Sequence, residues 1–242
     1  MKKILAFAGF SLLAVGAFAQ TNLQVFYDFG EDRKFVTSTL EMFKADDWGN
    51  TFFFVDYNHN GKNADDKIVC PSETYMEIAR CWNFWGDTSL APLSFQIEYN
   101  GGFGQGYAIE KAWLFGVDYF LHSADFSNTF NFKALYKHWP VNDGIPLQFT
   151  FVWGMQDLFG VSGLRFSGFV DFWGYKVNYL QKDLTYKERN WVFLSEPQLW
   201  YNIGSLFNCP NFNIGGEVEL SNNFANHEGF MVNPCLGVKW DF

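Results

Sequence analysis

The chain of 242 residues carries 26 acidic side chains against 17 basic ones, a formal net charge of −9. Phosphate binding needs a basic surface, so this balance excludes nucleic acid as the partner. Aromatic residues make up 21% of the chain, yet the mean hydropathy is −0.11, because apolar residues alternate with polar ones. Beyond the N-terminal segment, nothing approaches the ~20 continuous apolar residues of a transmembrane helix.

The first 19 residues have the layout of a secretory signal peptide. Lys2 and Lys3 precede an apolar run over residues 4–15, and Ala17-Phe18-Ala19 offers a small-x-small cleavage site. We therefore expect residues 1–19 to be an export signal and residues 20–242 to form one domain.

Twelve segments, separated by clusters of Gly, Asn, Asp and Pro, are predicted to be β-strands. In chain order they are 21–29, 35–43, 49–58, 72–84, 90–100, 110–121, 125–138, 146–155, 162–174, 190–203, 211–222 and 230–242. Alternation is clear in 90–100, where Leu93, Phe95 and Ile97 are separated by Ser94 and Gln96. Such a strand has one apolar and one wet face. A β-sandwich would show the same pattern.

The connections separate a membrane barrel from a sandwich. Counted from a periplasmic N-terminus, the even connections lie near 44–48, 85–89, 122–124, 156–161 and 204–210, each about 3 to 7 residues. The longest connections, 59–71 and 175–189, are both odd. Short periplasmic turns with longer external loops are typical of bacterial barrels. The sequence therefore predicts an all-β fold, a transmembrane antiparallel up-and-down β-barrel of about 12 strands in the bacterial outer membrane. The last segment, ending on Phe242, resembles the closing strand of such barrels.

Twelve strands leave an interior wider than the eight-stranded barrels that side chains fill, so we expect a lumen. Taking the polar parity as inward gives an acidic lining of Asp28, Glu41, Asp56, Glu77, Glu98, Asp118, Asp171, Glu196, Glu217, Glu219 and Asp241. Basic residues of that parity are Lys133, Lys137, Arg165 and Lys239. Such a field favours cations or neutral polar solutes over anions.

One basic residue does not fit this inward set. Arg80 falls on the apolar parity of its segment. Either a bulge shifts the register there, or the side chain lies near a membrane interface.

Several motifs resemble the Tsx family, outer-membrane channels specific for nucleosides. They are Leu40-Glu41-Met42-Phe43, Asp47-Trp48-Gly49, Phe52-Phe53-Phe54-Val55-Asp56, Met76-Glu77-Ile78, and Asp157-Leu158-Phe159-Gly160 followed by Phe169, Asp171, Phe172, Trp173 and Gly174. Their order and spacing cover about residues 21–242, and the chain looks still closer to an uncharacterised Tsx-like family of short barrels. The chain departs from the nucleoside channels in its shorter external loops and in Cys81, which stands near a charged position of that family.

The resemblance implies a solute-binding set in the lumen. Phe52, Phe54 and Phe169 would stack on a base, and Asp56, Glu77 and Asp171 would hydrogen-bond ribose hydroxyls or base edges. Trp173 has the same inward parity and completes the set. The alternative for each aromatic residue is that it fills the barrel and packs against its neighbours.

Three functions are compatible with these features. The favoured one is passive diffusion of nucleosides or similar small polar solutes, with no cofactor and no metal. The second is a structural or surface-interaction barrel without transport, acting through 59–71 and 175–189. An enzyme is disfavoured, because the four histidines show no His-x-Ser-x-Gly-like context. The expected partners are outer-membrane lipid, lipopolysaccharide, the barrel-assembly machinery and the small polar solute.

Four cysteines, Cys70, Cys81, Cys209 and Cys235, would enter an oxidising compartment. One or two disulfides or unpaired thiols both fit, and their spacing does not choose between these.

Overall fold

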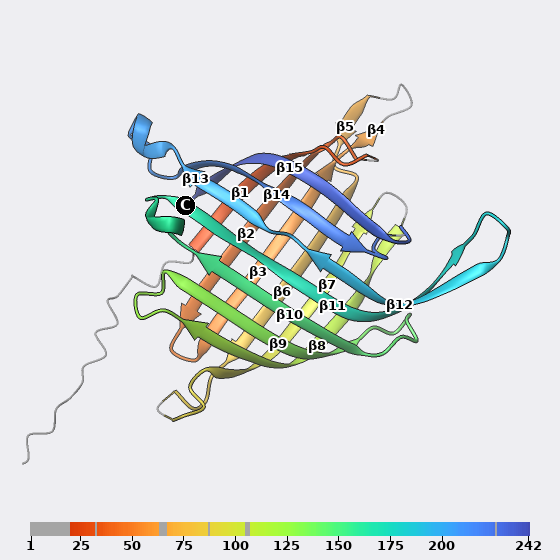
Figure 1. The fold of residues 1–242 in the computed structure, drawn as a ribbon, viewed down its shortest axis with the longest axis horizontal. Coiled ribbons are helices and arrows are strands. Elements are labelled where there is room, and N and C mark those ends of the chain that lie inside the picture. Colours follow the sequence, from red (N-terminus) through yellow and green to blue (C-terminus); the bar gives the residue numbers. More distant parts are fainter. Residues whose placement is uncertain (1–19, 32, 63–66, 87, 105–106, 226) are drawn as a thin grey trace, which may run out of the picture.

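The computed structural model describes residues 20–31, 33–62, 67–86, 88–104, 107–225 and 227–242. The predicted export signal, 1–19, lies outside the described residues. Within the described residues fifteen strands form, and all but the short β4 and β5 belong to one sheet (Figure 1). The strands are β1 (Gln20–Asp28), β2 (Val36–Asp46), β3 (Gly49–His59), β4 (Gly61–Lys62), β5 (Ile68–Cys70), β6 (Glu73–Trp82), β7 (Leu93–Gly104), β8 (Tyr107–His122), β9 (Asn128–His138), β10 (Leu147–Met155), β11 (Leu164–Leu180), β12 (Tyr186–Ser195), β13 (Gln198–Asn202), β14 (Phe212–Asn222) and β15 (Phe230–Asp241).

The sheet closes on itself as an antiparallel barrel. β1 pairs with β15 from Asn22 opposite Asp241 to Asp28 opposite Cys235, and β10 pairs with β11. β12 and β13 lie between the same two neighbours, β11 and β14, so they form one interrupted strand of the wall. Pro197 stands in the interruption, where it has no N–H to donate to a ladder. The barrel thus has twelve strand positions, which confirms the predicted fold class.

Two predictions about the connections are wrong. Residues 175–189 are largely not a loop, because β11 and β12 continue as a two-stranded ribbon beyond the barrel wall (Figure 1). The ladder holds through Leu180 opposite Tyr186, and a register shift between Gly174 and Val177 marks where the ribbon begins. The even connections are not all short either. That between β6 and β7 takes up 83–92, and that between β13 and β14 contains a 3₁₀ helix, η2 (Gly204–Phe207).

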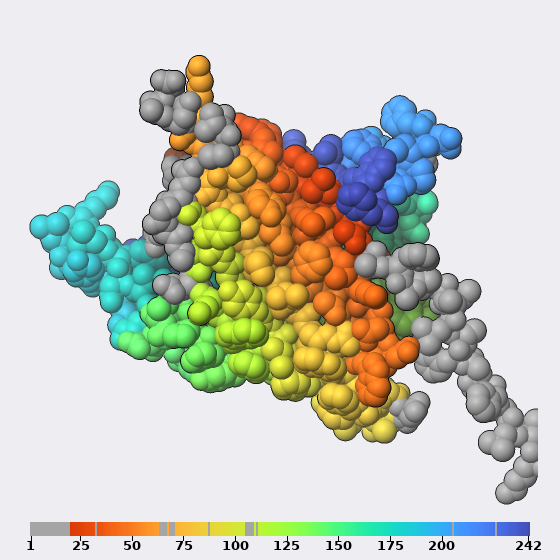
Figure 2. All heavy atoms as spheres, turned by 180° about the vertical axis from the view of Figure 1, so that it is seen from behind, coloured from red at the N-terminus to blue at the C-terminus, as the bar shows by residue number. Residues whose placement is uncertain are grey.

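The barrel wall is polar inside and apolar outside, the reverse of a soluble barrel. In β1, Gln24 and Phe26 are buried, whereas Leu23, Val25 and Tyr27 are exposed. Neighbouring strands around the barrel show the same alternation, because directly paired residues share a face of the sheet. Figure 2 shows one face of this wall from outside, formed by β1, β2, β3, β6, β7 and β8. A surface of this kind needs an apolar solvent, and lipid is one.

No helix within the described residues has the length and apolar character needed to span a bilayer.

Part of the interior is filled by apolar side chains. Phe26 and Trp200 form one buried cluster with Cys235, and their ring centroids lie 5.5 Å apart. Leu114 and Leu135 form another, on the opposite part of the wall. The lumen is therefore narrower than the number of strands alone implies.

The thiols of Cys81, Cys209 and Cys235 are free. The side chain of Cys70 lies outside the described part of the chain.

Candidate functional site

The predicted solute-binding residues all lie on the inward face of the barrel. Phe52, Phe54 and Asp56 alternate along β3, and Glu77 faces the lumen from β6 because it pairs directly with Phe54. These four side chains are half-buried, unlike the fully buried lining residues around them. They therefore border the space that remains in the lumen.

The rings on this wall lie close to one another. The centroids of Phe52 and Phe54 are 6.1 Å apart, and those of Phe54 and Tyr75 are 6.0 Å apart. The Tyr75 hydroxyl donates a hydrogen bond of 2.7 Å to Glu77 Oε1, which also accepts one of 2.9 Å from Asn100. Tyr75 was not predicted as part of the site, although its inward parity was visible in the sequence. An aromatic surface thus lies beside a hydrogen-bonded carboxylate.

β11 brings the other predicted residues to the far wall. Phe169 and Asp171 are half-buried, and Asp171 accepts a hydrogen bond from Thr150. Trp173 is buried, with the Lys137 ammonium 4.5 Å from its ring centroid and Phe224 edge-on at 6.0 Å. Phe169 and Asp171 therefore border the open space of the lumen, whereas the Lys137 ammonium lies over the ring of Trp173.

The two walls approach each other at one level of the lumen. β6 and β11 are separated by four strands on one side of the ring and by more on the other. Yet Glu77 lies within electrostatic range of Asp171, Glu98 and Lys137. Side chains from the two walls thus lie within electrostatic range of each other at this level, which we call the constriction.

Two lysines of β9 supply positive charge at this constriction. Lys133 has Asp118, Glu98 and Asp171 as its electrostatic neighbours. Asp118 is fixed by Asn131, whose Nδ2 donates to both of its oxygens at 2.8 and 3.0 Å. We call Lys133, Lys137, Glu77, Glu98, Asp118 and Asp171 the lysine side of the lumen.

Another part of the lining has carboxylates with no lysine among their main electrostatic neighbours. Glu196 lies within range of Glu217, Glu219 and Asp56. Gln198 donates a hydrogen bond of 2.6 Å to Glu217, and Thr39 donates one of 2.6 Å to Asp56. We call Asp56, Glu196, Glu217 and Glu219 the acidic side.

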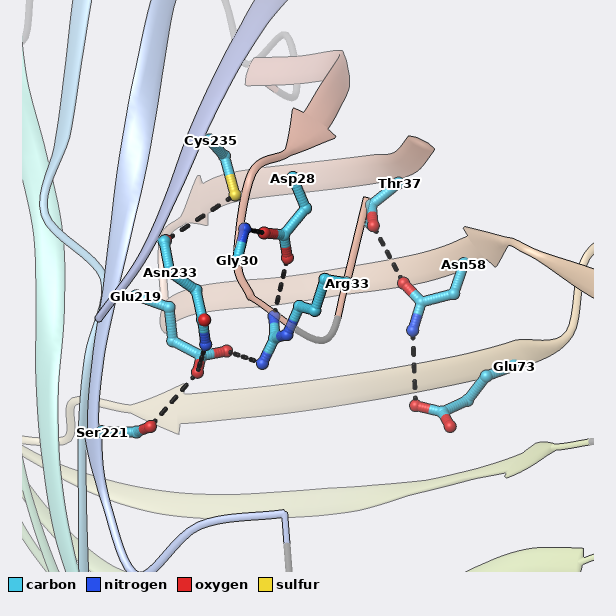
Figure 3. A network of polar contacts seen from close by, with 10 residues as sticks. All are labelled: Asp28, Gly30, Arg33, Thr37, Asn58, Glu73, Glu219, Ser221, Asn233 and Cys235. Atoms are coloured by element: carbon cyan, nitrogen blue, oxygen red, sulfur yellow. Dashed lines mark hydrogen bonds and ion pairs between the residues drawn. The ribbon is translucent and has the colours of Figure 1, made fainter. Parts of the chain in front are cut away.

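A loop residue supplies the positive charge that the acidic side lacks. Arg33, in the connection between β1 and β2, donates to Asp28 at 3.1 Å and to Glu219 at 2.6 Å (Figure 3). Burial alone would lower the pKa of Arg33, but Glu219 and Asp28 more than offset it, so the pKa is raised and the guanidinium is always charged. Sequence reasoning missed Arg33, because parity assigns a face only to residues in strands.

Arg80 faces outward without any bulge. The ladders of β6 with β3 and β7 are unshifted at Arg80. Its guanidinium donates to Asp46 at 2.6 and 2.9 Å and lies 5.7 Å from the ring centroid of Trp82. Of the two alternatives, the position near an interface therefore holds, at the end of the wall beside the β2–β3 turn.

One histidine forms a contact that bears on catalysis. His59 ends β3, and its Nε2 lies 2.7 Å from the Ser38 hydroxyl on the outward face. Within the described residues, no carboxylate or amide is found to hydrogen-bond the other ring nitrogen of His59. A hydrolytic triad needs such an orienting group beside the hydroxyl and the imidazole.

The described residues contain no group of three or more His, Cys, Asp or Glu side chains arranged to hold a metal ion.

Residues 19–242 match the family described as Domain of unknown function (DUF5020). The chain belongs to this family. No curated protein matches this DUF5020 chain. Among solved structures, the NanC porin has a TM-score of 0.56 at 8% identity, with 92% of this chain and 100% of that chain covered. The KdgM porin in complex with disordered oligogalacturonate has a TM-score of 0.50 at 9% identity, with 92% of this chain and 99% of that chain covered.

These likenesses concern the fold. The DUF5020 chain shares the barrel architecture of porins of similar length. The resemblance to nucleoside-specific Tsx channels is confirmed by none of these comparisons and stays a prediction.

Proposed function

We propose that this protein is an outer-membrane channel through which small polar solutes, nucleosides among them, diffuse passively. The observation that carries the proposal is the half-buried lining of Phe52, Phe54, Asp56, Glu77 and Asp171 inside a closed barrel with an apolar outer surface. Such a lining offers both π-faces and hydrogen-bond acceptors to a solute in water. The porin fold of the neighbours supports the same function.

A nucleoside would use both walls of the constriction. Its base would stack on Phe54 or Phe169, since every nucleobase has a π-face. Its hydroxyls and amino groups would donate to Glu77 and Asp171. Several weak sites in series favour passage, because binding must attract the solute and still release it. No cofactor, metal or energy source is needed.

Export and membrane insertion complete the proposal. Residues 1–19 would direct export, and the barrel-assembly machinery would insert the barrel into the bacterial outer membrane. The apolar belt would then contact lipid, and the ribbon formed by the ends of β11 and β12 would lie near lipopolysaccharide.

Single-channel recording tests the proposal. The purified protein is inserted into planar bilayers, and the current is measured with and without adenosine or uridine. We expect discrete conductance steps and a concentration-dependent block by nucleoside. Conductance without block would exclude nucleosides as the solute and leave the proposed channel function in place.

A closed barrel without transport is the second candidate, and one observation favours it. Gln96, Leu114 and Trp200 all point inward and are at most 1% exposed, so part of the lumen is filled. A folded protein, recognised by different gel migration before and after boiling, that gives no current in bilayers would establish this candidate instead.

A further inference from the structure

The Arg33 guanidinium occupies a pair of carboxylates that is held in place without it (Figure 3). Asp28 and Glu219 have side chains only 4% and 7% exposed. Asp28 Oδ1 accepts the Gly30 N–H at 2.7 Å. Glu219 Oε1 accepts hydrogen bonds from Asn233 at 3.0 Å and from Ser221 at 3.2 Å. Each carboxylate is thus oriented through one oxygen.

The other oxygen of each carboxylate faces the cation. Arg33 Nη1 contacts Asp28 Oδ2, and Arg33 Nη2 contacts Glu219 Oε2. Asp28 and Glu219 belong to β1 and β14, on either side of β15. Because the wall strands and their hydrogen bonds fix both carboxylates, the two free oxygens keep their spacing if Arg33 leaves.

Arg33 is the less restrained partner. Its side chain is 30% exposed and comes from the connection between β1 and β2, not from the wall. The carboxyl groups of Glu196 and Glu217 lie near Glu219 on the same side of the lumen, where Arg33 is the basic group among the main electrostatic neighbours of Glu196. The site therefore attracts a second cation that reaches it through the lumen.

We propose that Asp28 and Glu219 form a binding site for the guanidinium or primary ammonium group of a cationic solute, which exchanges there with Arg33. The inference rests on the proposed function, since the solute reaches the site through the lumen. Exchange replaces one cation by another, so neither carboxylate is left buried and unpaired. The tethered Arg33 competes at a high effective concentration, which keeps solute binding weak enough for release.

Chemical rescue tests the site independently of conductance. Arg33→Ala removes the resident guanidinium, and ethylguanidinium is added at millimolar concentration to the full chain in detergent. We expect it to raise the thermal unfolding midpoint of Arg33→Ala but not that of the unsubstituted protein or of Arg33→Ala combined with Glu219→Gln. The matched control is Arg189→Ala, since Arg189 also makes a 2.6 Å ion pair, with Glu228 outside the lumen. A midpoint of Arg33→Ala that ethylguanidinium leaves unchanged, or raises equally without Glu219, would overturn the site.

Current block tests the exchange. The concentration of ethylguanidinium that halves the current should be about tenfold lower for Arg33→Ala than for the unsubstituted channel, because the tethered competitor is gone. Arg189→Ala should behave as the unsubstituted channel. Equal half-blocking concentrations with normal conductance would overturn the exchange alone. Rescue of the midpoint without any conductance would overturn the proposed channel and leave a guanidinium site without transport.

Discussion

The two sides of the lumen neutralise their carboxylates in different ways. On the lysine side, Lys133 and Lys137 stand in β9, so the wall itself supplies the positive charge. On the acidic side, the nearby positive charge is Arg33, which comes from a connection between strands. A charge fixed in a ladder cannot leave without breaking the wall, whereas a charge on a connection can. The lysine side is therefore structural, and the acidic side is suited to exchange.

The largest expected effect comes from breaking the lysine side. Lys133→Met removes the positive charge that interacts with Glu98, Asp118 and Asp171, and we expect a loss of about 3 kcal/mol in the free energy of unfolding. Arg33→Ala should cost only about 1 kcal/mol, because the Arg33 side chain is 30% exposed and each carboxylate keeps the hydrogen bonds to its other oxygen. Unfolding by urea in detergent measures both. Lys111→Met, at an exposed position of β8, serves as the control, and equal losses for Lys133→Met and Arg33→Ala would contradict the comparison.

The second prediction concerns the place where the two sides meet. Phe54 pairs with Glu77 of the lysine side, and Asp56 of the acidic side lies two residues further along β3. Phe54→Ala should raise the half-blocking concentration of adenosine about tenfold, which corresponds to the loss of one stacked base. Phe53→Ala, the adjacent residue on the outer face, should leave the block unchanged. An equal effect from both variants would show that losing either ring disturbs the barrel wall, and that stacking of Phe54 on the solute does not cause the block.

A smaller effect is expected on charge selectivity, with opposite signs on the two sides. Lys137→Gln should increase the permeability of K⁺ relative to Cl⁻, and Glu217→Gln should decrease it, each by about twofold. Reversal potentials under a KCl gradient measure the ratio. Shifts in the same direction would mean that the two sides do not face one common lumen.

The smallest expected effect is on the ribbon, which lies outside the lumen. It serves as a reference for the effects on the two sides of the lumen. Hydrogen bonds from Gln181 and Lys187 lower the pKa of Glu228, with a further contribution from Arg189. A carboxyl whose folded-state pKa is depressed contributes stability above its unfolded pKa of 4.5 and loses it as pH falls through the folded pKa. We expect faster hydrogen exchange in the ribbon below about pH 4.5, corrected for the intrinsic rate. Glu228→Gln should show no such change.

Parity made most of the wall predictable. Residues such as Asp118, Glu217 and Lys239 were assigned to the lumen correctly, because a side chain in a strand has only two faces and a bilayer requires one of them to be apolar. Closure followed from the same pattern, since no sheet edge is tolerated in lipid.

The errors arose where no period applies. The alternation of polar and apolar residues assigns no face to Arg33, because Arg33 lies outside the strands. Its partners, Asp28 and Glu219, are far apart in the chain. The sequence predicts a connection over 175–189, whereas in the structure a ribbon forms there and the Lys176–Glu188 pair at 3.1 Å depends on the register of its two strands. Leu114 and Leu135, which narrow the lumen, share the inward parity with polar residues and gave no separate signal.

The pairing of β1 with β15 has a consequence for folding. Asn22 pairs with Asp241, and the Phe242 N–H donates to Thr21 O at 2.8 Å, so the seam joins residues from opposite ends of the described chain. Contacts of such sequence separation form late and slowly. Until they form, β1 and β15 each present an unpaired edge, which aggregates in water and is unsatisfied in lipid. An open intermediate therefore precedes closure of the barrel, and its exposed edges disappear only when β15 pairs with β1.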